Sequence, residues 1–324
     1  MTPSVIVVGS LHYDIIVRSS RMPVLGETLP GESWQSKCGG KGGNQAAEAA
    51  RHIAGVTMIG CIGRDDMGRQ LRRNLEDARV DTRHIRDTDE RSGISLVISE
   101  QHGDYAAIIV SGANLSLSEV DITHAAPLFT AGSVVVLQNE VPASVNLAAA
   151  RLAHECGCRV VLNAAPARTL EPELAPFIDI LVVNAIEAEM LGGGIVSDLP
   201  AAVQAVDVLG RYAPTVVVTV GGAGLVARSG DALYSLSPHA VQLVSTHGAG
   251  DAFVGALSAR LAAGATIEDA LAYGNAAAAV LVSTDEEHRK HLTEGETLAM
   301  LHNRAAQPAG HALASLQETG LPIA

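Results

Sequence analysis

The chain has 324 residues, 48% of them hydrophobic, so it can bury a large core as one big α/β domain or as two. Its 22 basic residues stand against 35 acidic residues, and the resulting net charge of −13 repels phosphate backbones. We therefore expect no nucleic-acid partner.

Location in the cell can also be inferred from the sequence. The four cysteines have no paired Cys-x-x-Cys spacing of a zinc site and are too few for a disulfide framework, so we interpret them as reduced thiols. Met1 is followed within a few residues by an apolar strand, without the basic segment and long apolar run of a signal peptide. The apolar stretches 134–137 and 216–220 are too short to span a bilayer. The sequence predicts a cytoplasmic protein with no membrane partner.

Strands and helices are expected to alternate along the chain. Short apolar runs predict strands at 5–9, 56–61, 134–138, 159–163, 180–183 and 215–220. Helices are predicted near 44–54, 66–78, 143–156, 186–192, 199–211, 249–263 and 267–283. Such alternation implies a Rossmann-like α/β fold, in which helices cover both faces of a mostly parallel sheet.

Two segments, 12–38 and 92–110, break this alternation. Both are extended and alternating in character, and the turn-like residues 101–104 join two strand-like runs in the second segment. After residue 284 the charge cluster 285–291 predicts a solvated loop that leads to a last helix.

The most informative motif is Ser-Thr-His-Gly-Ala-Gly-Asp-Ala-Phe at residues 245–253. Small residues at Gly248, Ala249 and Gly250 let successive backbone N–H groups converge on an anion, and the following helix adds the positive end of its dipole. Asp251 would then lie beside the charge on which it acts. The pattern alone leaves a second interpretation open, in which Asp251 is only the N-terminal acid of a capped helix.

A second glycine-rich motif, Gly-Gly-Lys-Gly-Gly-Asn-Gln at 39–45, precedes an Ala-rich helix. Such a loop lets a ligand approach the backbone closely, although many loops of this kind only turn. It is not a Walker A loop, because Gly42 stands where Ser or Thr is required. A nicotinamide dehydrogenase is disfavoured, because Phe253 occupies the third glycine position of the dinucleotide fingerprint.

Together the two motifs resemble the two signatures of the ribokinase-like (PfkB) carbohydrate kinase family. Further matches follow in family order: Val8-Gly9-Ser10 with Asp14, Gly112-Ala113-Asn114, Gln138-Asn139-Glu140, Asn163-Ala164-Ala165-Pro166-Ala167, Asn184-Ala185-Ile186-Glu187 and Thr219-Val220-Gly221-Gly222-Ala223-Gly224. The resemblance implies an α/β core of residues 1–11, 39–91 and 111–324. It also implies a small β-sheet lid of residues 12–38 and 92–110, which commonly forms the contact of a homodimer.

The resemblance implies an ATP-dependent kinase that phosphorylates a primary hydroxyl of a pentose or related furanose. Asp251 matches the base that accepts the hydroxyl proton. Around Gly248, the N–H groups of Ala249, Gly250 and Asp251 would bind the γ-phosphoryl group.

Nucleotide and sugar contacts are implied by the same match. The nucleotide positions are Asn184, Glu187, Thr219, Gly221, Gly222, Gly224 and Asn275. Glu187 would act through water on the Mg²⁺ that accompanies ATP, because Mg²⁺ gives up its waters reluctantly. The sugar positions are His12, Asp14, Gly40, Lys41, Asn44 and Glu140. Without the family order, Glu187 is an acidic helix face, Asp14 a turn residue and Glu140 a solvated strand end.

The chain departs from the family pattern at three places. His12 stands where ribokinase proper carries Asn, which leaves the sugar open. Ser245 replaces a common acid, and residues 285–287 replace a glycine-containing loop that helps to hold a monovalent cation. We therefore expect activity to depend on Mg²⁺ but little on K⁺.

Two alternatives remain open at this stage. A nucleoside or pseudouridine kinase would use His12 against a base, although an aromatic content of 3% leaves few stacking platforms. A non-catalytic sugar-sensing protein would explain the departures at His12 and Ser245. The retention of both Lys41 and Asp251 favours catalysis over sensing.

Overall fold

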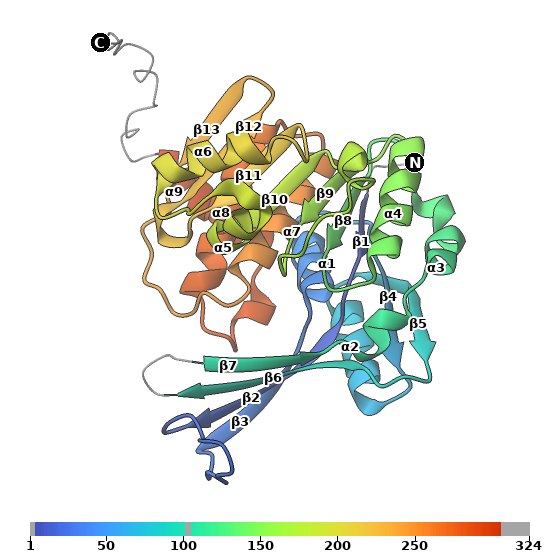
Figure 1. The fold of residues 1–324 in the computed structure, drawn as a ribbon, viewed down its shortest axis with the longest axis vertical. Helices are drawn as coiled ribbons and strands as arrows, with labels where there is room; N and C mark the ends of the chain where they lie inside the picture. The colour runs from blue at the N-terminus through green and yellow to red at the C-terminus, as the bar shows by residue number, and fades with distance from the viewer. Residues whose placement is uncertain (1–3, 101–104, 306–324) are drawn as a thin grey trace.

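The structure is a computed structural model that describes residues 4–100 and 105–305. A large sheet with helices on both faces forms the body of the molecule, and a small second sheet projects from one end (Figure 1). This arrangement confirms the predicted α/β fold class.

The large sheet has nine strands in the order β13-β12-β11-β10-β9-β8-β1-β4-β5. All neighbours pair in parallel from β5 to β11, and the last two strands pair antiparallel. The strands are β1(Val5–Val8), β4(Val56–Gly63), β5(Asp81–Thr88), β8(Val134–Gln138), β9(Arg159–Asn163), β10(Ile180–Asn184), β11(Thr215–Thr219), β12(Leu225–Ser229) and β13(Ala232–Leu236).

Three of these strands, β5, β12 and β13, were not predicted. β5 and β13 are the two edge strands, where one side of the ladder is unpaired and few side chains are buried. β12 lies between β11 and β13, and its short run Leu225–Ala227 is buried. The sequence of β5, Asp-Thr-Arg-His-Ile-Arg-Asp-Thr, has no apolar run, because an edge strand needs to bury only part of its length.

The helices fill two apolar layers, one on each face of the large sheet. One layer packs α4(Ala143–Glu155) and α6(Leu199–Leu209), and the other packs α1(Lys41–His52), α2(Asp66–Asp77), α7(Ala249–Ala262) and α8(Ile267–Ser283). The predicted helix at 186–192 is α5(Ala185–Ala188) followed by the π-helical turn Glu189–Gly193, and the short α3(Glu119–His124) was not predicted.

The small sheet has the strand order β3-β2-β6-β7 and will be called the lid. Its strands are β2(His12–Ser19), β3(Ser33–Gly39), β6(Gly93–Glu100) and β7(Tyr105–Val110), and they fall in the two segments expected to be extended. The predicted turn at 101–104 lies outside the described residues. Because side chains alternate along a strand, His12 and Asp14 share one lid face, and Ile15 and Val17 share the other.

The charge cluster after residue 284 forms a loop with the 3₁₀ turn Arg289–His291 and leads to α9(Glu294–Ala305), as expected. The expectation that this loop is solvated holds for most of its residues, but not for Glu286 and Arg289. Glu286 is half-buried and pairs with Lys37 of the lid, and Arg289 is half-buried against the segment that precedes α7. Across the described residues, no helix is both long and apolar enough to cross a membrane.

Candidate active site

The site is built where α7 begins. Gly248 is the residue before the helix and has a φ of +83°, a left-handed conformation that glycine adopts without strain. A Cβ atom on Gly250 would meet no protein atom within 4 Å, so the glycine leaves open space beside the helix N-terminus. Asp251 occupies the first turn of α7, as the sequence predicted.

Two amides of α1 hold the carboxylate of Asp251. Asn44 donates to Oδ2 at 3.0 Å and Gln45 donates to Oδ1 at 2.9 Å. Burial raises the pKa of Asp251, whereas Lys41 and the two amides favour its charged form. Asp251 is thus a fixed, partly desolvated carboxylate and not merely a helix cap.

A cavity of about 160 Å³ opens beside Asp251. It brings together several predicted site residues that are remote in sequence. Its lining consists of Lys41, Asn163, Ala165, Val182, Val183, Asn184, Glu187, Thr219, Thr246, Gly248, Ala249, Gly250, Asp251 and Phe253. The predicted catalytic residues therefore share one cavity with Lys41 and with three of the predicted nucleotide residues.

Backbone N–H groups at the start of α7 can donate hydrogen bonds to an anion. The first N–H groups of an α-helix have no partner within the helix. Here the N–H of Ala249 donates to the carbonyl of Thr246 at 3.2 Å, so this donor, which we expected to bind the phosphoryl group, is already used within the turn. The N–H groups of Gly250 and Asp251 are the donors that remain at the N-terminus of α7.

Lys41 supplies the positive charge of the cavity. Burial by itself would lower the pKa of Lys41, but the carboxylates of Asp251, Glu140 and Glu187 outweigh it and raise that pKa. The lysine is therefore a permanent ammonium ion where phosphoryl oxygens would gather.

Asn184 and Glu187 form a reciprocal cap at the start of α5. Asn184 Oδ1 accepts from the N–H of Glu187, and Glu187 Oε2 accepts from the N–H of Asn184, each at 2.9 Å. Burial raises the pKa of Glu187, although the Asn184 N–H and Lys41 oppose that rise. The cap fixes Glu187 at the cavity wall with Oε2 engaged, which leaves Oε1 as the oxygen that can meet a water of a hydrated cation.

Two of the predicted sugar residues, His12 and Asp14, lie on lid strand β2. Asp14 is buried, and burial raises its pKa to about 6, with Lys37 opposing the rise and Glu140 and Asp251 adding to it. Glu140 Oε2 accepts from the Ser10 hydroxyl and from the N–H of Lys41, the latter at 3.1 Å.

His12 lies beside Glu140 with its Nδ1 3.6 Å from Glu140 Oε2. Burial lowers the pKa of His12. The carboxylate of Glu140 acts in the opposite direction, but its effect is smaller. Its Nε2 is buried and has no hydrogen-bond partner within the described part of the chain. A buried polar atom of this kind is costly unless a ligand or a water satisfies it.

Four predicted nucleotide residues lie outside the cavity lining. Gly221, Gly222 and Gly224 form the turn that follows β11, next to Thr219, and space for a side chain is open at Gly221 and Gly222. Asn275 lies on α8, where its amide donates to the carbonyl of Ser237 at 2.9 Å. The roles of all these site residues stay predictions.

Several site residues were not predicted. Gln45 donates to both Asp251 and Asn163, and accepts from Gln138 at 2.8 Å. Gln45 and Asn163 belong to motifs that the sequence displays, but nothing local says that their side chains meet. In the sequence, the only indication that Gln45 belongs to the site was its position next to Asn44.

A carboxylate and a lysine beside a helix N-terminus of an α/β fold are the groups that a phosphotransferase uses. Residues 2–288 match the model of the pfkB family of carbohydrate kinases. The chain therefore belongs to this family and is a carbohydrate kinase.

Known proteins support the assignment. The chain is 34% identical over 306 residues to a ribokinase of Haemophilus influenzae, which covers 94% of this chain and all of the relative. It is 33% identical over 255 residues to a deoxyribokinase of Salmonella typhi, covering 77% and 82% of the two chains. A ribokinase of Arabidopsis thaliana, solved in complex with ribose and ATP, has a TM-score of 0.85 and 30% identity and covers 93% of this chain and 99% of that one.

Proposed function

We propose that this kinase transfers the γ-phosphoryl group of ATP to the primary hydroxyl of a pentose furanose. The observation that carries the proposal is the position of Asp251, held by two amides beside the free N–H groups of the α7 N-terminus and facing the same cavity as Lys41. The similarity to an Arabidopsis ribokinase complexed with ribose and ATP supports ATP as the donor and a pentose as the acceptor.

In this mechanism Asp251 accepts the proton of the attacking hydroxyl. The N–H groups of Gly250 and Asp251 and the ammonium of Lys41 stabilise the charge that spreads over the transferring group. On the lid side, Asp14 accepts hydrogen bonds from hydroxyl groups of the sugar, and the amide of Asn44 offers a further donor and acceptor.

Magnesium would enter with the nucleotide. No set of three or more His, Cys, Asp or Glu side chains in the described ranges is arranged to hold a metal ion alone. Glu187 fits a hydrated Mg²⁺, because it is fixed at the cavity wall and Mg²⁺ gives up its waters reluctantly. When bound, the ion neutralises charge on the β- and γ-phosphoryl oxygens.

The location in the cell is part of the proposal. All four cysteines are free thiols, which supports a cytoplasmic enzyme.

Because of His12, a nucleoside is considered as a second class of acceptor. The Nε2 of His12, which has no partner among the described residues, could meet a sugar hydroxyl, the position left by a missing hydroxyl, or the base of a nucleoside. The chain is similar to both a ribokinase and a deoxyribokinase, so 2-deoxyribose belongs among the first acceptors to test.

The test is a coupled ADP-release assay with MgATP and a panel of D-ribose, 2-deoxy-D-ribose, other pentoses, hexoses, nucleosides and pseudouridine. We expect a pentose to have the highest kcat/KM and the product to carry its phosphate on the primary hydroxyl. The variant Asp251→Asn tests the proposed base. Sugar binding should persist in this variant, while kcat falls by about two orders of magnitude or more.

Other outcomes are decisive as well. A nucleoside turned over about tenfold better than any free sugar would replace the proposal with a nucleoside kinase. Binding of a sugar with no turnover of any acceptor would support the sensing protein. An Asp251→Asn enzyme with more than about a tenth of wild-type kcat would remove Asp251 from its role as the base.

A further inference from the structure

Arg289 makes an unusual set of contacts close to the site. Its guanidinium donates to three backbone carbonyls, each at 3.0 Å: Nε to Thr284, Nη1 to His247 and Nη2 to Ser245. Two of these carbonyls belong to the segment that leads into α7, and the third follows the end of α8. The sequence did not point to Arg289, which lies in a cluster of charges interpreted as solvated.

Further hydrogen bonds fix the backbone of Arg289 and of the segment that it contacts. The carbonyl of Arg289 accepts from Arg51 Nη2 at 2.7 Å, at the end of α1. The N–H groups of Val244 and Ser245 both donate to the carbonyl of Val282 in α8. Arg289 is half-buried, so its contacts with the segment are partly shielded from water.

The peptide geometry links this contact to the cavity. In a planar trans peptide the C=O and the N–H point in opposite directions. Because the carbonyls of Ser245 and His247 are directed at Arg289, the N–H groups of the following residues, Thr246 and Gly248, are directed away from it. Thr246 and Gly248 both line the cavity beside Asp251.

We propose that Arg289 is a positioning residue for phosphoryl transfer, which orients the 245–248 turn and takes the place of a monovalent cation at its carbonyls. Backbone carbonyls that converge on one point are a common way to bind K⁺. A guanidinium is always charged and cannot dissociate from the chain, so it supplies this charge without any ion from solution.

This inference rests on the proposed kinase function and deepens it. It gives a physical cause for weak K⁺ dependence: the position is filled by the chain itself. It also predicts that removing the guanidinium creates a dependence that the wild-type enzyme lacks.

The experiment compares wild type, Arg289→Ala and Arg289→Lys, with Arg228→Ala as the matched control. Arg228 of β12 pairs with Asp207 of α6 and is not among the residues that line the cavity. Turnover is measured in K⁺ and in tetramethylammonium at constant ionic strength, and again with guanidinium added far below denaturing concentrations. Sugar affinity without nucleotide and the melting temperature report on the fold.

For wild type and Arg228→Ala we expect less than about a threefold change in kcat between the two cations. Arg289→Ala should lose about tenfold or more in kcat, with sugar affinity changed by less than about threefold. Potassium or guanidinium should restore about fivefold of that loss. Arg289→Lys keeps one charge but cannot span three carbonyls, so its kcat should fall between the two, and it carries the test if Arg289→Ala does not fold.

The inference is overturned by an Arg289→Ala enzyme that keeps more than half of wild-type kcat. It is equally overturned by a loss that neither cation restores, because a purely structural role would give that result. If the wild type turns over no acceptor, the proposed function fails separately. Arg289 is then tested by MgATP affinity, which should weaken about fivefold in Arg289→Ala and recover with K⁺.

Discussion

At the scale of single residues, four carboxyl groups lie at the site, and three of them interact with Lys41. Asp14 and Glu187 are buried, Glu140 and Asp251 are half-buried, and Lys41 interacts with three of the four. Burial is the largest cause of the raised pKa values of Asp14, Glu187 and Asp251, and neighbouring carboxylates add to it. The site therefore holds negative charge at a cost, and proton uptake should change how it binds ligands.

Sugar affinity should depend on pH through Asp14, whose pKa is raised to about 6. Above this pH the proposed role of Asp14 is to accept hydrogen bonds from two sugar hydroxyls, and below it the neutral acid loses acceptor capacity. The sugar dissociation constant should be flat above about pH 7 and rise about tenfold per unit well below pH 6. Calorimetry without nucleotide, from pH 5 to 8 in steps across that range, measures it directly.

Asp14→Asn provides the control for this pH effect. Its sugar affinity should be weak at every pH and should not change across the acid range, because the titrating group is gone. An acid limb that persists in Asp14→Asn would assign the titration to another carboxyl group. A dissociation constant that is the same at both ends of the range would contradict the prediction.

At the scale of elements, the loop between α8 and α9 connects two parts of the molecule. Glu286 pairs with Lys37 and accepts from Gln35, both on lid strand β3, each at 3.0 Å. Three residues later, Arg289 holds the segment before α7. One short loop thus contacts both the lid and the turn before α7.

Removing the charge of Glu286 should loosen the lid with little effect on chemistry. The Lys37–Glu286 pair is partly exposed, and such pairs contribute about 1 kcal/mol or less. For Glu286→Gln we expect the KM for sugar to rise about two- to fivefold at low salt, with kcat nearly unchanged. Steady-state kinetics at low and high ionic strength test this, because salt screens the pair in the wild type too.

Two further variants complete this test. Glu287→Gln removes an exposed charge from the same loop and should change neither constant. The double variant Lys37→Met/Glu286→Gln should be no worse than either single variant, because both remove the same pair. Additive losses would mean that the two residues act independently.

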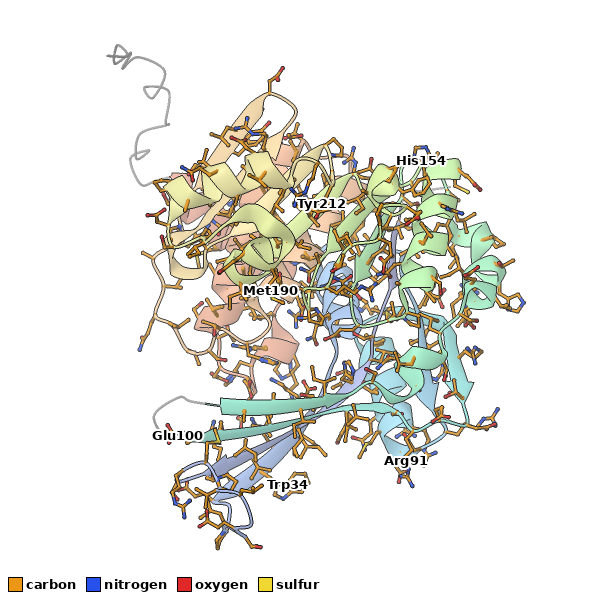
Figure 2. The ribbon with its side chains drawn as sticks, viewed as in Figure 1. Trp34, Arg91, Glu100, His154, Met190 and Tyr212 are labelled. Carbon is orange, nitrogen blue, oxygen red and sulfur yellow. The ribbon has the colours of Figure 1, made fainter. Side chains whose placement is uncertain are left out.

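At the scale of the whole molecule, the lid carries an apolar face opposite the face that holds His12 and Asp14. Figure 2 shows Trp34 on the lid. Cross-strand register places Trp34, Val17 and Ile98 in one row and Ile15, Leu96 and Ile108 in the next. Trp34 is 71% exposed and Ile108 is 66% exposed. A contiguous exposed apolar patch of this kind marks an interaction surface, and we propose that a second copy of the chain covers it.

Charge on this face should therefore prevent dimer formation. We expect the wild type to be a dimer by light scattering, and Ile108→Glu or Trp34→Glu to be monomeric at the same concentration. Leu233→Glu, at an exposed position on β13, is the control and should leave the dimer intact. A wild-type monomer, or a dimer that survives both lid substitutions, would contradict the proposed contact.

Local pattern was enough to predict the elements that the core requires. Central strands such as β8 and β10 are buried along almost their whole length, so their apolar runs are unmistakable. Edge strands and the short α3 were missed because they bury few side chains. A periodic pattern of apolar residues arises only where one face of an element is buried.

Motif order predicted most of the cavity, because glycines and a carboxylate at a helix N-terminus carry their chemistry locally. Asp251, Lys41 and Glu187 do line one cavity. The same reasoning assigned the Ala249 N–H to the anion, whereas the turn itself uses that donor. A local motif specifies which groups are present but not which of them a fold has already paired.

The sequence by itself determined the fold class, the family and the residue types at the start of α7, since these depend on neighbours along the chain. Only the tertiary structure decided what surrounds them. The amide of Asn44 reaches Asp251 across 207 residues, and Arg289 reaches Ser245 across 44. Hydrogen bonds, burial and pKa values depend on distances in space, and a fold sets those distances by packing segments that no sequence window contains together.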